Sequence, residues 1–142
     1  MREVKRSALV SQPPARIYAL INDVERYPEF VPWCTQARVL SRSPAEIVAA
    51  LHVRQGALSG EFTTRNTLTP ESAVHMQLVS GPFRLLEGAW QLSPIAPHGC
   101  RVELDVRFEF KSRLSGMLFE SLFANTVASL VDAFVQRART TA

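Results

Sequence analysis

Strict alternation of apolar and charged residues near the end of the chain constrains its fold more than any other feature. Apolar side chains at every second position from Cys100 to Phe110 alternate with charged ones from Arg101 to Lys111. Successive side chains of a strand point to opposite faces of a sheet. The segment therefore predicts a strand with one buried face and one charged face, as in an antiparallel sheet that is wet on one side.

The same period of two continues through most of the chain. Turn-forming pairs such as Ser43-Pro44, Gln55-Gly56 and Gly81-Pro82 divide it into segments. The strands that we expect cover residues 4–10, 35–42, 46–54, 60–69, 72–79, 83–93 and 100–111.

Helices are expected at both ends of this strand-rich region. Ser11 is a candidate N-cap for a short helix that opens at Pro13 and Pro14, and residues 23–30 indicate a second short helix or turn. A long helix is predicted over 114–139, with an apolar stripe that contains Phe123, Val127, Leu130, Val131, Phe134 and Ala138.

The first half of the long helix is apolar on more than one side. Leu114, Leu118 and Leu122 project almost opposite to the stripe, and Met117 and Phe119 lie between. A helix that is apolar all round needs a second partner besides the sheet. The candidates are a ligand in a cavity, an overlying loop or short helix, another subunit and a membrane surface.

Together these elements predict an α+β fold in a single domain over residues 1–142. A curved antiparallel sheet of about seven strands would surround the long C-terminal helix, with two short helices after the first strand. Such an arrangement commonly leaves an apolar cavity between sheet and helix, where small molecules bind.

Charge and composition exclude several classes of protein. The net charge is +3 at a pI near 9.3, and all but two of the 16 basic residues are arginines, spread without a basic tract. A DNA-binding surface is therefore not predicted. Cys34 and Cys100 are too few for a disulfide scaffold or a zinc site. With neither a leader-like segment nor an apolar run of membrane-spanning length, we expect a cytoplasmic protein.

Catalytic patterns are missing from the sequence. His52, His75 and His98 do not stand at metal-ligand spacing, and no nucleophile elbow or phosphate-binding loop occurs. Cys34 is expected to be a small buried side chain, because nothing nearby in sequence would activate it. We therefore predict no catalytic residues, no metal and no enzymatic activity.

Two polar residues are predicted on the inward face of the sheet. By parity with Phe62, Thr64 and Asn66 point inward, where they need hydrogen-bond partners from a ligand, the backbone or water. On the long helix, Glu120 shares the core stripe and could serve the helix dipole, pair with an arginine or line the cavity mouth. Gly116 on the same stripe would allow close approach of backbone or ligand.

Residues 22–34, with the elements Asp23-Val24-Glu25-Arg26-Tyr27-Pro28 and Phe30-x-Pro32-Trp33-Cys34, carry a family resemblance. They resemble the coenzyme Q-binding family of START-like domains, in the polyketide cyclase and lipid-transport superfamily. Phe62-Thr63-Thr64-Arg65, Gly81-Pro82-Phe83 and Gly88-x-Trp90 match in the same order. The resemblance covers essentially the whole chain and implies the helix-grip fold.

The resemblance implies a binding protein with ubiquinone or a related lipid as ligand, no required cofactor, and a role in respiratory electron transport. Other bacterial members are described as toxins that bind the large ribosomal subunit and block subunit joining, and this stays as the alternative. Cyclase activity is only a superfamily label here, because no acid and base pair is present. Transient contact with the inner face of a membrane and the oligomeric state stay open.

The fold and the motif together predict the ligand-binding residues, although plain core packing is an equal alternative for each aromatic side chain. A cap over the open end of the sheet, a cavity floor and a wall or gate are expected. The cap comprises Phe30, Pro32 and Trp33. The cavity floor comprises Phe62, Asn66, Trp90, Leu92, Phe108 and Phe110. The wall or gate comprises Leu118, Phe119, Leu122 and Phe123.

Overall fold

The computed structural model describes residues 1–140, apart from the side chain of Ser115, so the last two residues of the predicted domain lie outside it. Within this range seven strands form one antiparallel sheet in the order β1-β7-β6-β5-β4-β3-β2. The strands are β1 (Arg2–Val10), β2 (Cys34–Arg42), β3 (Glu46–Gln55), β4 (Leu58–Thr69), β5 (Ala73–Ser80), β6 (Phe83–Ile95) and β7 (Gly99–Phe110).

Three helices complete the described part of the chain: α1 (Pro14–Asn22), the 3-10 helix η1 (Val24–Glu29) and the long α2 (Arg113–Thr140). The predicted strands and the long helix are confirmed to within two residues at each end. The prediction of Ser11 as N-cap is wrong. Pro13 takes that position without a side-chain hydrogen bond, and the helix begins at Pro14, whose fixed φ suits the first helical turn.

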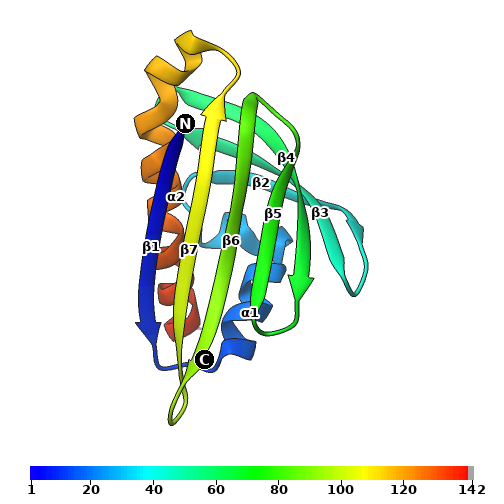
Figure 1. Cartoon of the computed structure of the whole chain (residues 1–142), viewed down its shortest axis with the longest axis vertical. Coiled ribbons are helices and arrows are strands. Elements are labelled where there is room, and N and C mark those ends of the chain that lie inside the picture. The colour runs from blue at the N-terminus through cyan, green and yellow to red at the C-terminus, as the bar shows by residue number, and fades with distance from the viewer. Residues whose placement is uncertain (141–142) are drawn as a thin grey trace.

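The sheet curves around α2, which confirms the helix-grip architecture (Figure 1). Because β1 pairs with β7, the first and last strands lie side by side, with Val4 opposite Val106. The buried side of α2 presents Val127, Val131 and Phe134 to the core. By length and composition alone α2 is also apolar enough to cross a membrane.

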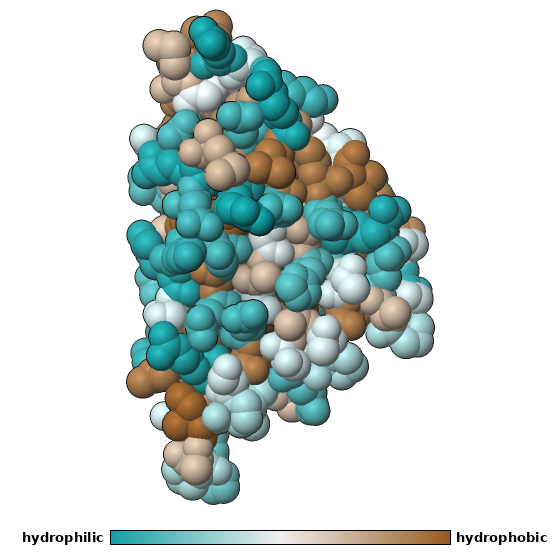
Figure 2. Space-filling view, in the orientation of Figure 1, coloured by the Kyte–Doolittle hydropathy of each residue, from teal (hydrophilic) through white to brown (hydrophobic). Residues whose placement is uncertain are grey.

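The outer face of the sheet carries the charged set of the alternating strand. Arg101 pairs with Glu103 at 3.2 Å, and Arg107 pairs with Glu87 on β6. Teal and white atoms cover most of this face in Figure 2. The expected wet outer face is therefore confirmed, and several of its charges are paired within the sheet.

The start of α2 has no cover from the described residues 1–140. Leu114, Met117 and Leu118 are 66%, 84% and 60% exposed, so an overlying loop is not the second partner of this helix. A Cβ built at Gly116 would meet nothing within 4 Å, so the close approach of backbone is not observed among the described residues, and the approach of a ligand stays a prediction. The Glu120 carboxylate lies 3.4 Å from the Arg2 guanidinium. Of the three roles considered for Glu120, pairing with an arginine is therefore the one observed.

Candidate functional site: an apolar cavity between sheet and helix

A cavity of about 80 Å³ lies between the inner face of the sheet and α2. The sheet contributes side chains from β3 to β7, and η1, Trp33 and α2 close the other side. Almost all of the lining is aliphatic or aromatic, as in a typical small-molecule site. The volume, however, is below the roughly 300–1,000 Å³ of such sites, so a larger ligand would enter only if side chains move.

Two aromatic clusters bound the cavity. In the first, Phe123 of α2 packs 4.7 Å from Phe108 and 6.2 Å from Phe62, measured between ring centroids. In the second, Phe134 of α2 lies 5.1 Å from Trp90 and 5.3 Å from Tyr27. Edge-to-face geometry dominates both clusters, which is the favourable arrangement for aromatic rings. The cavity thus has rigid aromatic ends and an aliphatic middle.

Two polar residues of the lining are neighbours on β4. The Thr64 hydroxyl donates a hydrogen bond to the Asn66 Oδ1 at 2.9 Å, and both side chains are buried. Because this bond occupies the oxygen end of the amide, the Asn66 Nδ2 is left as a donor, and no described residue of 1–140 accepts from it. From the sequence we expected a ligand, the backbone or water to be the hydrogen-bond partner of each side chain. The partner observed is a fourth kind, because the two side chains bond to each other.

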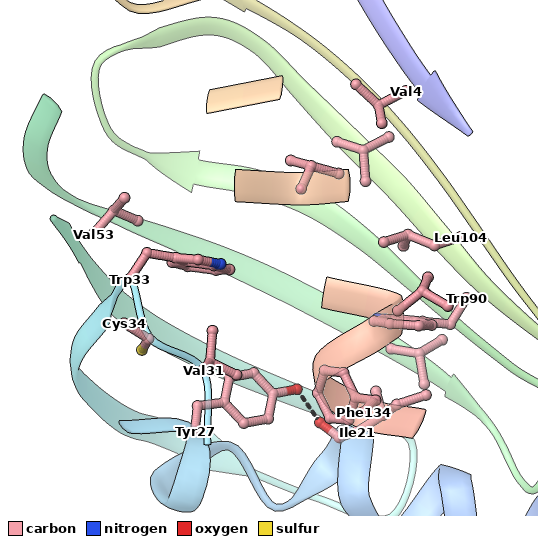
Figure 3. Packing of buried hydrophobic residues seen from close by; sticks show 14 of the residues in the cluster. Val4, Ile21, Tyr27, Val31, Trp33, Cys34, Val53, Trp90, Leu104 and Phe134 are labelled. Carbon is pink, nitrogen blue, oxygen red and sulfur yellow. Dashed lines mark hydrogen bonds between the residues drawn. The ribbon is translucent and has the colours of Figure 1, made fainter. Parts of the chain in front are cut away.

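Trp33 is fixed to α2 by a chain of hydrogen bonds. Its indole N–H donates to the Ser129 hydroxyl at 3.0 Å, and that hydroxyl donates to the Thr126 carbonyl at 2.8 Å. Figure 3 shows Trp33 directed inward from the start of β2, opposite the side of the core where Trp90 and Phe134 lie. The loop between η1 and β2 therefore closes one end of the cavity as a part of the core.

Two titratable side chains next to the cavity, Tyr27 and Cys34, are held neutral by burial. Desolvation raises the pKa of Tyr27 well above its ordinary value, so its phenol stays protonated and donates to the Ile21 carbonyl (Figure 3). Desolvation likewise raises the pKa of the Cys34 thiol to about 11. An unreactive thiol agrees with the expected role of Cys34 as a small buried side chain.

Five of the predicted site residues line the cavity: Trp33, Phe62, Asn66, Trp90 and Phe123. The remainder lie elsewhere. Leu92, Phe108 and Phe110 are buried in the core behind the cavity, and Phe119 and Leu122 are half-buried on α2. Phe30 packs on Phe134, with ring centroids 5.2 Å apart, while Pro32 and Leu118 are exposed.

Sequence reasoning missed several lining residues, among them Tyr27, Met76, Thr126 and Phe134. Tyr27 stands inside the family motif, which was a usable signal. Thr126 is a polar residue beside the apolar stripe of α2, only 1% exposed, and its hydroxyl returns a hydrogen bond to the Leu122 carbonyl at 2.9 Å. Periodicity alone does not reveal such a residue, because its polar group is satisfied within its own helix.

The described residues, 1–140, hold no cluster of three or more His, Cys, Asp or Glu side chains that could bind a metal ion. Among the described cavity-lining residues the acidic side chain is Glu87, and its carboxylate pairs with Arg107 on the outer face of the sheet. The arrangement can therefore bind an apolar molecule and offer it one amide donor.

Fold and cavity together define a helix-grip domain built around an internal apolar site. A family model described as polyketide cyclase / dehydrase and lipid transport matches residues 10–135, and the chain belongs to this family. The resemblance found in the sequence is thereby confirmed.

Known relatives fall under two kinds of name. The chain is 42% identical to the ribosome association toxin RatA of Vibrio cholerae, covering 98% of this chain and 96% of the relative. It is 34% identical to the mitochondrial coenzyme Q-binding protein COQ10 of Saccharomyces cerevisiae, covering 96% and 70%. Among solved structures it resembles the ZhuI aromatase/cyclase from Streptomyces, with a TM-score of 0.86 and 17% identity over 97% of this chain and 93% of that one. This last likeness concerns the fold alone.

Proposed function

We propose that this protein binds a prenylated quinone of the ubiquinone type, or a closely similar lipid, without catalysing a reaction on it. The observation that carries the proposal is an apolar cavity whose buried wall presents one amide donor, the Asn66 Nδ2. A quinone has matching chemistry, since its ring carbonyls accept hydrogen bonds and the remainder of the molecule is apolar. The relative named as a coenzyme Q-binding protein supports the same ligand class.

The proposal requires the cavity to widen when the ligand enters. At about 80 Å³ the space holds only part of a substituted ring. Met76, whose side chain has three rotatable bonds, and Leu130, which is half-buried on α2, are lining residues that can move at low cost. The tail would then extend past the half-buried Phe119 and Leu122 towards the exposed start of α2.

Solvent extraction of the purified protein, followed by mass spectrometry, tests this proposal. We expect a quinone in near-stoichiometric amount, and a protein that carries none and cannot be loaded with one in detergent would contradict it. In Asn66→Val the amide donor is lost, so the affinity for the quinone should fall about tenfold, the effect of one hydrogen bond. Thr64→Val breaks the same pair but keeps the Nδ2 donor, and it should retain the ligand.

A second candidate is association with the large ribosomal subunit. Identity to the relative named as a ribosome association toxin is higher than identity to the coenzyme Q-binding relative, 42% against 34%. The charge pattern gives this candidate less support. Arginines on the outer face, such as Arg38 with Glu61 and Arg65 with Glu46, are paired with carboxylates rather than free for phosphates.

Co-sedimentation with isolated large subunits at low and at high salt separates the two candidates. Ribosome association predicts a pellet at low salt that is lost at high salt, because phosphate contacts release counterions, and it predicts no effect of Asn66→Val. Protein that stays in the supernatant at low salt would exclude this candidate and leave the quinone proposal standing.

A further inference from the structure

The first turns of α2, with Lys111 just before them, form an exposed surface that combines apolar and basic side chains. We call this surface the α2 tip: Lys111, Arg113, Leu114, Met117 and Leu118. Figure 1 shows this part of the helix rising beyond the end of the sheet, and in Figure 2 brown and tan atoms appear beside teal ones there. Leu114, Met117 and Leu118 stand at helical spacings of three and four, so they share one face. The three side chains are 66%, 84% and 60% exposed.

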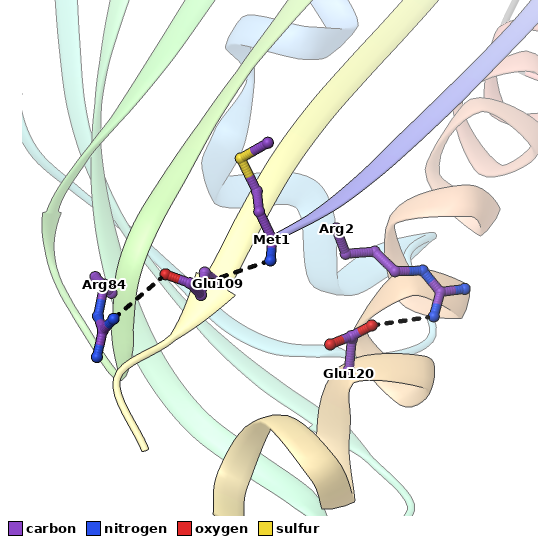
Figure 4. Close-up of polar contacts among 5 residues, drawn as sticks. All are labelled: Met1, Arg2, Arg84, Glu109 and Glu120. Carbon is purple, nitrogen blue, oxygen red and sulfur yellow. Dashed lines mark hydrogen bonds and ion pairs between the residues drawn. The ribbon is translucent and has the colours of Figure 1, made fainter. Parts of the chain in front are cut away.

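Charge at the α2 tip is positive. Lys111 and Arg113 are exposed, and neither pairs with a carboxylate of the described residues 1–140. The nearby carboxylates already have cationic partners, because Glu120 pairs with Arg2 at 3.4 Å and Glu109 pairs with Arg84 at 3.8 Å (Figure 4). Lys111 and Arg113 thus remain as uncompensated charge around the apolar face.

We propose that the α2 tip docks on the surface of an anionic lipid bilayer. Apolar side chains flanked by lysine and arginine have the composition of interfacial membrane segments, whose basic groups meet anionic headgroups while the apolar groups enter the acyl boundary. A protein partner suits this surface less well. A stable protein interface buries about 800 Å² on each side, more than three side chains at the end of one helix supply.

Along α2 the tip leads towards the cavity. Phe119 follows it on α2 and lies 6.5 Å from Phe110, and Phe123, one turn further along, lines the cavity. A docked protein would therefore hold the end of the cavity that Phe123 lines nearer to the bilayer, where an apolar ligand is dissolved. This route rests on the proposed function, whereas the docking itself is measured without any quinone.

Flotation with vesicles of phosphatidylcholine alone, or mixed with phosphatidylglycerol, tests the docking. On mixed vesicles the double variant Lys111→Gln/Arg113→Gln should bind about 25-fold more weakly, since each basic group near an anionic surface contributes about fivefold. Met117→Ser/Leu118→Ser should weaken binding to both vesicles by at least about tenfold, because its apolar groups no longer enter the boundary. These side chains are exposed, so melting temperatures should match that of the wild type.

Matched controls lie away from the α2 tip, on β1 and at the C-terminal end of α2. Arg6→Gln/Arg139→Gln removes the same charge and Leu9→Ser removes an apolar side chain that is 67% exposed, and both should float like the wild type. Docking is overturned if the wild type does not float with mixed vesicles, or if tip and control variants float alike. It is also overturned if Met117→Ser/Leu118→Ser only converts a dimer to a monomer in size-exclusion chromatography, because a second copy would then cover the tip. Quinone loading in detergent is a separate readout, so a failure of docking leaves the proposed function intact.

Discussion

Thr64 and Asn66 bring polarity into an otherwise apolar wall. Alternation along β4 predicted that both point inward, because residues two apart share a face of the strand. The bond between them was not predictable in the same way, since it depends on side-chain rotamers that the sequence pattern does not specify. The consequence for function is the direction of the Asn66 amide, which offers its donor end to the cavity.

Replacing Thr64 by valine tests the energetic role of this pair. The change keeps the shape of the side chain but leaves the buried Asn66 Oδ1 without its donor. We expect the free energy of unfolding to fall by about 1–3 kcal/mol, as measured by urea denaturation. An unchanged midpoint would show that the two side chains do not form this bond in solution.

The burial of Cys34 predicts that the protein loses stability as the pH rises into the alkaline range. Burial raises the pKa of its thiol from the ordinary 9.0 to about 11. Between these values the unfolded chain has lost the proton and the folded protein keeps it, so raising the pH favours unfolding. This contribution is fully present below pH 9 and is lost by about pH 11.

Comparison with Cys34→Ala isolates this effect from other titrating groups. Across pH 9 to 11 the wild type should lose about 2 kcal/mol more stability than the variant, from the cited change in pKa. Urea denaturation at four values between pH 8 and pH 11 measures the difference. Parallel curves for the two proteins would refute the assignment.

At the scale of elements, the approach of β6 to its neighbours shapes the cavity floor. A Cβ added at Gly88 would lie 2.9 Å from the Val106 Cγ2 and 3.0 Å from the Asp105 carbonyl oxygen on β7, and 3.2 Å from the Met76 Cε on β5. The backbone neighbour on β7 cannot move aside as a flexible side chain can. Glycine is therefore required at this point of the family motif by packing.

Gly88→Ala should destabilise the protein by about 2 kcal/mol through overpacking. Gly60→Ala, in strand β4 of the same sheet, is the matched control, because its Cβ would meet nothing within 4 Å; it should be neutral or slightly stabilising. Thermal denaturation of the two variants measures both effects. Equal melting temperatures would contradict the close approach at Gly88.

At the scale of the whole molecule, periodicity predicted the fold well and the site less well. Alternation over β7 and the turn pairs between strands determine an antiparallel sheet locally, so their prediction needs no knowledge of distant contacts. The cavity depends on such contacts. Trp33 is held there by a hydrogen bond to Ser129, 96 positions later in the chain. Leu118 stays outside the cavity because it lies on the exposed side of α2.

The central claim is that the cavity between sheet and helix binds a quinone. Titration with a short-chain ubiquinone analogue in dilute detergent tests it directly, because quinones quench tryptophan fluorescence and Trp33 and Trp90 both line the cavity. We predict saturable one-to-one quenching that is lost in Ala49→Leu, which fills the cavity, and kept in Ala89→Leu, which adds the same bulk on the outer face. Non-saturable quenching, or equal quenching in both variants, would contradict the account.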